Sequence, residues 1–167
     1  MIQTPRTRIR PYGKSDVALI ASILSDTTTM SFWPRPLNEK AVAEWVERNA
    51  GSFRETGLGR MLVELRMTGE VIGDCGVALT EVDGKVEHDL GYIIHNSYWE
   101  RGLGVECARA CLEYALREKG LRRIVANMPH DHPASIRVAE SLGMDWERSF
   151  ANHRNREILT RLYVYTP

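Results

Sequence analysis

The spacing of apolar residues alternates along the chain between a helical period and a strand period, so both kinds of element are expected. Helical spacing covers residues 17–23, 38–53, 105–119 and 133–142. Strand-like runs cover residues 6–11, 61–66, 71–79, 86–95, 123–128 and 158–165, and a further strand opens at Trp146. The first of these runs has little apolar content and suits a short edge strand whose arginines face water.

Capping residues define the ends of the predicted helices. Ser15 or Asp16 is suited to cap the first helix, and Asn38 is suited to cap the second, because their side-chain oxygens accept from free backbone amides. Gly120 and Gly143 follow the third and fourth helices and are natural stops. Four separate helices are therefore expected.

Two turn signals divide the middle of the chain into hairpins. Thr68-Gly69 and Asp83-Gly84 each separate two strand-like runs, and the second signal is the stronger because Asp-Gly suits a type I′ turn. The element order is then strand, two helices, three strands in hairpins, helix, strand, helix and two strands. This order predicts a single α/β domain over residues 1–167, built on a mixed, mostly antiparallel sheet.

Composition narrows the class of protein. The chain has 167 residues, of which 43% are hydrophobic, and its 22 Lys and Arg balance its 22 Asp and Glu. No basic footprint for nucleic acid and no apolar run long enough for a membrane span is present. With three cysteines and no signal-peptide pattern at the N-terminus, the sequence predicts a cytoplasmic protein in a reducing compartment.

A glycine-rich turn in the segment 98–106 carries the clearest chemistry. Gly102 and Gly104 flank one leucine where an apolar strand gives way to an amphipathic helix. Backbone amides at such a helix start can converge on a pyrophosphate, although the same glycines also suit a tight turn or close packing. A dinucleotide fold is disfavoured because its Gly-x-Gly-x-x-Gly pattern lacks the third glycine here.

Several segments in this order resemble the GCN5-related N-acetyltransferase (GNAT) superfamily, and the branch with ribosomal-protein N-terminal acetyltransferases is the most similar. The resemblance covers nearly the whole chain. The matching segments are Thr4 to Arg10, Val71 to Gly76, Leu90 to Ile94, Tyr98 to Gly104 and Pro133 to Met144.

The resemblance implies a sheet that splays between its fourth and fifth predicted strands, with acetyl-CoA as co-substrate in the gap. Its pantetheine arm would bond to the backbone at Ile93 and Ile94, and no metal is required. The family's glycine turn falls on residues 99–104, with Trp99 where relatives carry Gln or Arg. The amides that would hold the pyrophosphate belong to Arg101, Gly102, Leu103, Gly104 and Val105.

Two further positions match the cofactor side of the family. His132 stands where relatives commonly carry an asparagine that contacts the pantetheine arm, and a helix-capping role is favoured for it over a role as proton donor. Ser135 matches the family and can bond either the cofactor or the first turn of its helix. His130-Asp131-His132 finds no further ligands at a recognisable spacing, so a metal site is not expected.

Acetyl transfer to an amine needs a base to free the amine and a donor to protonate the leaving thiolate. Glu87 and Asp89 alternate onto one face of a strand, and Asp89 aligns with the glutamate that relatives often use as base. Asp89 is the first choice and Glu87 the fallback, while an ordinary ion pair or catalysis by positioning alone remains an alternative. The tyrosine that many relatives use as proton donor aligns with Ala139 here. Tyr92, Tyr163 and Tyr165 are the alternative candidates for that role.

The resemblance implies that the wall of the site on the acceptor side comes from two loops, residues 30–36 and 148–156. Phe32 and Trp33 would form an apolar lid, and Arg154 belongs to a basic loop that favours an acceptor carrying acidic groups. A merely solvated loop is equally consistent with those charges. A peptide N-terminus, an amino-acid-like metabolite and an aminoglycoside-like amine all remain open.

The predicted function is acetyl-CoA-dependent N-acetylation of a primary amine by direct transfer in a ternary complex. A non-catalytic acyl-CoA-binding module is the alternative, motivated by the departures at His132 and Ala139, and a structural interaction domain is the third class. The predicted partners are acetyl-CoA and an amine, with neither nucleic acid nor membrane. Either a monomer or a homodimer is expected.

Overall fold

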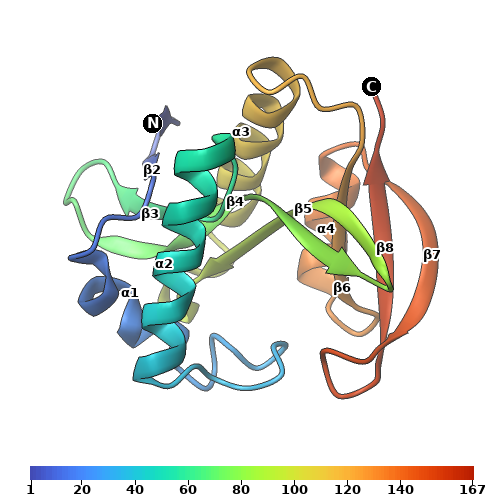
Figure 1. Ribbon diagram of the computed structural model, residues 1–167, viewed down its shortest axis with the longest axis horizontal. Coiled ribbons are helices and arrows are strands. Elements are labelled where there is room, and N and C mark those ends of the chain that lie inside the picture. Colours follow the sequence, from blue (N-terminus) through green and yellow to red (C-terminus); the bar gives the residue numbers. More distant parts are fainter.

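Eight strands form one sheet in the computed structural model, which describes residues 1–167, and helices cover both faces of this sheet (Figure 1). The strand order is β1-β2-β3-β4-β5-β6-β8-β7. The strands are β1 (Ile2–Gln3), β2 (Thr7–Arg10), β3 (Met61–Leu65), β4 (Val71–Val82), β5 (Lys85–Ile94), β6 (Ile124–Pro129), β7 (Asp145–Asn152) and β8 (Ile158–Tyr165). The helices are α1 (Asp16–Leu24), α2 (Glu39–Thr56), α3 (Leu103–Arg117) and α4 (Pro133–Ser141), with a 3₁₀ turn at Asn96–Tyr98.

Every neighbouring pair of strands is antiparallel except β5 and β6, which are parallel. This is the mostly antiparallel mixed sheet expected from the sequence, and the predicted fold class is confirmed. None of the helices is both long enough and apolar enough to cross a membrane.

Local signals act as predicted at several element ends. The Asn38 side chain accepts from the Ala41 amide at 2.9 Å and caps α2, and Gly120 and Gly143 have positive φ, 66° and 79°, just beyond α3 and α4. Asp83 and Gly84 both have positive φ, 50° and 77°, as a type I′ turn requires between β4 and β5.

The start of α1 differs from the prediction. Ser15 stands at the N-cap position, but its hydroxyl makes no capping hydrogen bond. Asp16 is buried instead, where it accepts from the Gly13 amide at 2.6 Å and pairs with Arg10 at 2.7 Å. The Asp16 carboxylate therefore pairs with Arg10 and does not serve as the predicted cap of α1.

Two strand predictions need correction. The run at residues 6–11 is not the edge of the sheet, because the two-residue β1 pairs outside β2 and is too short to leave a periodic signal. Its arginines are only partly in water, since Arg8 and Arg10 both pair with Glu64 of β3. At the other end of the chain, β7 continues to Asn152, so Arg148 lies in a strand and not in the expected loop.

Two hydrophobic clusters cover opposite faces of the sheet. One joins the sheet to α3 and includes Leu90 and Ile94 of β5, whereas the other joins it to α1 and α2 and includes Ile93. Side chains of β5 therefore alternate between the two layers, as a strand requires. Both layers meet on β5, which Figure 1 shows crossing the centre of the molecule.

Candidate active site

The parallel contact between β5 and β6 is short. One residue pair, Asp89 with Val125, forms the whole ladder between these strands, whereas β4 pairs with β5 without a break from Lys85 to Ile94. Beyond Asp89, β5 therefore continues with one edge unpaired. We call residues 90–94 the open edge of β5.

Asp89 occupies the last paired position before the open edge. Its Oδ1 atom accepts from the Asn127 Nδ2 atom of β6 at 2.9 Å. Burial raises the pKa of Asp89 to about 7, although the Asn127 hydrogen bond and the charge of Arg60 act in the opposite direction. A carboxylate with a pKa near neutrality can both accept and return a proton at physiological pH.

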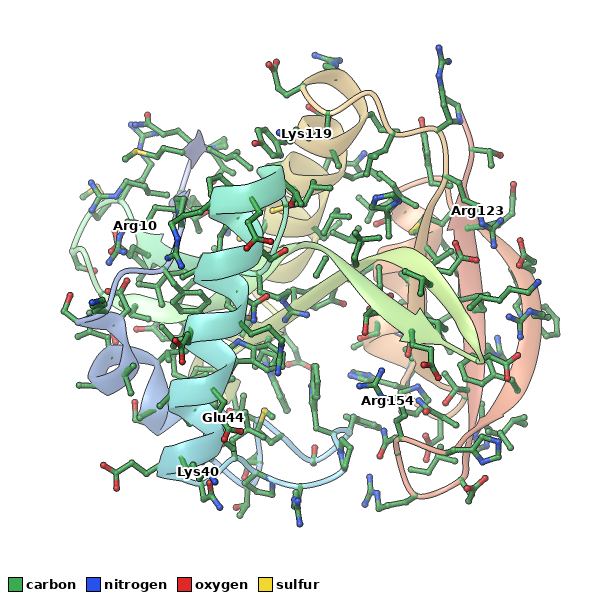
Figure 2. The ribbon with its side chains drawn as sticks, in the orientation of Figure 1. Arg10, Lys40, Glu44, Lys119, Arg123 and Arg154 are labelled. Carbon is green, nitrogen blue, oxygen red and sulfur yellow. The ribbon has the colours of Figure 1, made fainter.

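Glu87 has a different environment on the same strand. Its carboxylate pairs with Arg123 at 3.0 Å, and Arg123 also pairs with Glu147 of β7 at 2.7 Å. Figure 2 shows Arg123 beside the β7 and β8 strands, away from the centre of the molecule. Of the two predicted carboxylates, Glu87 is thus held in an ion-pair network and Asp89 is not.

The glycine turn forms the start of α3 as the sequence suggests. Gly102 is the N-cap residue and has φ 73°, a conformation that favours glycine, and no side chain caps the helix. The first helical bond runs from the Glu106 amide to the Gly102 carbonyl, so the amides of Leu103, Gly104 and Val105 precede it. These amides fit a pyrophosphate without any lysine.

Gly104 also lies against the open edge. An ideal Cβ atom at this position would be 3.2 Å from Cε2 of Tyr92, so a side chain here would press on β5. The turn and the strand are joined a second time, because Nε1 of Trp99 donates to the Ile94 carbonyl at 2.7 Å. The open edge with Ile93 and Ile94 therefore lies next to the glycine turn, an arrangement that would suit the pantetheine arm and the pyrophosphate of acetyl-CoA. Arg101 lies in the same turn, where its carbonyl accepts from Arg6 at 2.7 Å.

Two groups at the start of α4 face neighbouring elements. The Ser135 hydroxyl is 3.2 Å from the Tyr92 hydroxyl, which links α4 to β5, and burial raises the pKa of Tyr92 to about 12. His132 stands at the N-cap position without making a capping hydrogen bond, which corrects the expected capping role. Its ring stacks on Phe32 with centroids 3.7 Å apart, and burial lowers its pKa.

The two loops assigned to the acceptor lie against each other. Asn155, which precedes β8, donates from its side chain to the Phe32 carbonyl at 2.8 Å. Trp33 packs edge-on against Trp45 of α2 with ring centroids 5.7 Å apart. Arg154 donates to the Glu81 carbonyl at 3.2 Å, and Figure 2 shows its side chain reaching toward the β4–β5 hairpin.

Sequence reasoning missed a charged pair beside this region. Arg60 and Asp74 are 6% and 0% exposed, and Nη2 of Arg60 lies 2.5 Å from Oδ1 of Asp74. Asn127, the partner of Asp89, was missed as well. No local pattern marks these residues, because each obtains its partner from a different strand.

Comparison with known proteins identifies the family. The model of the acetyltransferase (GNAT) domain matches residues 6–145. The chain is 29% identical over 147 residues to the uncharacterized protein YkkB of Bacillus subtilis, covering 87% of this chain and 86% of that protein. It is 28% identical over 150 residues to the uncharacterized N-acetyltransferase YnaD of the same organism, covering 89% and 85%.

Solved structures share the fold at lower identity. A GNAT-family acetyltransferase from Bacillus anthracis has a TM-score of 0.80 at 23% identity, with 99% of this chain and 97% of that chain covered. A ribosomal-protein-S5-alanine acetyltransferase from Vibrio fischeri has a TM-score of 0.80 at 15% identity, covering 98% and 94%. RimL, a ribosomal L7/L12 α-N-protein acetyltransferase in complex with coenzyme A, has a TM-score of 0.79 at 16% identity, covering 98% and 95%.

The family match spans most of the chain and agrees with the splayed sheet and the glycine turn, so the resemblance expected from the sequence is confirmed. The chain belongs to the GNAT family of acetyltransferases, and it is an N-acetyltransferase.

Proposed function

We propose that this enzyme transfers the acetyl group of acetyl-CoA directly to a primary amine, with both substrates bound at the open edge of β5. The observation that carries the proposal is the position of Asp89, at the point where β5 and β6 part and with a pKa near neutrality. The coenzyme A bound to RimL supports the choice of co-substrate.

Backbone groups more than side chains would bind acetyl-CoA, the acetyl donor. The pantetheine arm would lie along Ile93 and Ile94 of the open edge, and the amides from Arg101 to Val105 would hold the pyrophosphate. His132 and Ser135 at the start of α4 would line the other side of the arm. Acetyl-CoA supplies the acetyl group as an activated thioester.

Asp89 is the proposed general base. An amine enters largely as its ammonium form at neutral pH, and it must lose a proton before its nitrogen can attack. Asp89 is one methylene shorter than glutamate, so we expect it to accept this proton through a water molecule. Glu87 is the weaker choice, since Arg123 already neutralises its charge.

Tyr92 is the proposed source of the proton for the thiolate. Its hydroxyl is protonated at neutral pH and donates to Ser135 at the start of α4 at 3.2 Å, although burial raises its pKa to about 12 and so makes it a weaker acid than a free tyrosine. The Tyr163 hydroxyl is instead paired with Glu140 at 3.1 Å. Tyr92 therefore suits the role that the family's tyrosine would fill at Ala139.

The loop with Phe32 and Trp33 and the loop with Arg154 would together form the wall of the site on the acceptor side. A peptide N-terminus or a small amine fits this assignment, and the RimL and S5 enzymes act on proteins by name.

The three buried, unpaired cysteines suit a reducing compartment, which supports a cytoplasmic location.

A screen of amines with release of coenzyme A thiol as the readout tests the proposal. The panel holds peptides with free N-termini, free amino acids, simple alkylamines and aminoglycosides. Release that depends on an amine and matches the N-acetylated product is expected for at least one class. Tight acetyl-CoA binding without release from any class would overturn the proposal and favour an acyl-CoA-binding module.

A further inference from the structure

Arg60, just before β3, lies in a buried polar network that the proposed chemistry does not use. Its Nε and Nη2 atoms donate to Oδ1 of Asp74 at 3.2 and 2.5 Å. The other carboxylate oxygen of Asp74 accepts from Tyr12 at 2.9 Å and from Trp45 Nε1 at 2.8 Å. Three donors thus fix Asp74, and Asp74 fixes one side of the guanidinium group of Arg60.

The remaining terminal nitrogen of Arg60 has no acceptor in the chain. Nη1 makes no hydrogen bond, yet every side-chain nitrogen and oxygen that is sealed from solvent has a partner. Nη1 must therefore reach solvent, although the residue is only 6% exposed. A buried guanidinium nitrogen that has no acceptor in the chain and is not sealed from solvent can donate to a ligand oxygen.

The free edge of the guanidinium group, Nη1, lies over β5. An ideal Cβ atom at Gly91 would be 2.1 Å from Nη1, so Arg60 occupies the space above this glycine. Asp89 is two residues earlier and points to the same face of the strand, at a spacing of about 7 Å. The base and the free guanidinium edge are therefore neighbours on one face.

Aromatic rings extend this face to the acceptor loop. The Cζ atom of Arg60 lies 5.5 Å from the ring centroid of Trp45, and Trp33 packs edge-on against Trp45. Trp33, Trp45 and Arg60 thus follow one another from the loop to β5, and Asp89 lies on the strand face that Arg60 covers at Gly91. We call these four residues the acceptor wall.

We propose that Arg60 binds the carbonyl or carboxylate oxygen of an α-aminoacyl acceptor whose amine lies beside Asp89. The inference rests on the proposed function and adds a substrate class to it. In an α-aminoacyl group the nitrogen and the oxygen lie about 3 Å apart. With a hydrogen bond of about 2.9 Å from Nη1 to the oxygen and the bridging water between the amine and Asp89, such a group reaches from Asp89 to the edge above Gly91.

Charge favours the same class over polyamines. A second ammonium group next to Arg60 would be repelled, whereas an oxygen would be attracted. Both a free amino acid and a peptide N-terminus carry the required oxygen, as a carboxylate in the first and a carbonyl in the second. The test therefore includes both sources.

The experiment measures a selectivity ratio. We compare kcat/KM for alaninamide with kcat/KM for isopropylamine, in which a methyl group replaces the carboxamide, and include alanine and an alanyl peptide as the two sources. The two amines differ in basicity, but this difference is the same for every enzyme variant. A change in the ratio between variants therefore reports the contact with the oxygen.

Two independent variants remove the contact. Arg60→Met combined with Asp74→Asn removes the ion pair as a unit, and Asp74→Asn alone is its matched control because it keeps Arg60. Gly91→Ala leaves both charges in place and displaces Nη1, which is the movable end of a side chain. The ratio is expected to fall about 10- to 100-fold in the double variant and in Gly91→Ala. Asp74→Asn keeps the Arg60 donor but loses the carboxylate that orients it, so its ratio is expected to fall less than that of the double variant.

The outcomes separate this inference from the proposed function. A ratio that is unchanged in a folded Gly91→Ala or double variant overturns the inference, as does an equal loss for both amines, which a purely structural role of Arg60 would cause. Transfer to amines with no effect of the carbonyl group overturns the inference alone. An absence of transfer to every amine overturns the proposed function and the inference with it.

Discussion

Asp89 and Glu87 lie on one strand face, but their neighbours give them different properties. Asp89 accepts a single hydrogen bond from a neutral amide, and burial raises its pKa to about 7. Glu87 faces the guanidinium group of Arg123. Because a general base works best with a pKa near the working pH, the single substitution Asp89→Asn is the sharpest test at the scale of one residue.

Asp89→Asn is expected to reduce kcat/KM by about 10²- to 10⁴-fold near pH 7 to 8. Wild-type activity should rise with pH through about 7 as Asp89 loses its proton. The variant should recover at higher pH, where solvent deprotonates the amine. A pH profile of kcat/KM for both proteins measures this difference.

Glu87→Gln is the matched control on the same strand. It should leave the rise near pH 7 in place, because it removes an ion pair and not the base. A profile that loses this rise in Glu87→Gln and keeps it in Asp89→Asn would assign the base to Glu87.

Asp89→Asn is expected to lower activity but to raise stability at neutral and higher pH. The raised pKa of folded Asp89 means that the fold favours the protonated acid, so this group stabilises the fold at low pH and loses that contribution as pH rises through about 7. Asp89→Asn should therefore have a higher free energy of unfolding than wild type at pH 8, with a smaller difference at pH 4. Urea unfolding at both values tests the sign, and a less stable variant at pH 8 would contradict it.

Gly104 tests the pyrophosphate site. Gly104→Glu places a negative charge among the amides that would hold phosphate, and acetyl-CoA affinity should fall by at least about 10- to 100-fold. Gly104→Ala is the control, because it keeps the amide and adds only a methyl group near Tyr92. Calorimetric titration measures both, and unchanged affinity in a folded Gly104→Glu variant would remove the site from this turn.

At the scale of elements, three contacts join the loop between α1 and α2 to the segments just before α4 and β8. Phe32 stacks on His132 before α4, Asn155 donates to the Phe32 carbonyl, and Arg156 reaches the Ser31 carbonyl at 3.5 Å. This loop and the loop before β8 therefore form one unit across the acceptor side.

Phe32→Ala should loosen both loops together. The lost ring stacking is worth about 0.5 to 1.5 kcal/mol beyond buried area, and hydrogen exchange should speed up in residues 31–36 and also in 153–157. His132→Phe keeps an aromatic ring at the stack and should preserve protection. Faster exchange confined to residues 31–36 would show that the two loops open independently.

At the scale of the whole molecule, the sheet consists of two antiparallel parts joined by one short parallel contact. β1 to β5 form the first part and β6, β8 and β7 form the second, and Asp89 with Val125 is the only pair between them. Figure 1 shows α1 and α2 with the first part and α4 with the second. A ligand bound along the open edge would contact both parts.

Acetyl-CoA should therefore stabilise the whole fold. At a concentration 100 times the Kd, linkage predicts about 2.7 kcal/mol, and Tm should rise by roughly 5 to 10 °C for a domain of this size. Gly104→Glu should lose this shift and Gly104→Ala should keep it. Thermal unfolding with and without acetyl-CoA measures the effect, and an unchanged Tm in wild type would contradict a donor site at the open edge.

The sequence by itself determined the four helices, every strand except the two-residue β1, the hairpin turn at Asp83-Gly84, the glycine turn at Gly102 and the family. These features depend on residues close together in the chain, such as Asn38 with Ala41 or Asp83 with Gly84, so a local pattern is sufficient to predict them. Even the alternation of Glu87 and Asp89 onto one face follows from the strand period alone.

Only the tertiary structure decided which groups face each other. Asp89 obtains Asn127 from a strand 38 residues away, and the Phe32 carbonyl obtains Asn155 from 123 residues away. Burial and the charges of partner residues set the pKa of Asp89 and leave Nη1 of Arg60 without an acceptor. The spacing of residues along the chain predicts neither property. For this reason the glycine turn was predictable from the sequence, while the distinction between Asp89 and Glu87 and the unpaired Nη1 atom of Arg60 required the fold.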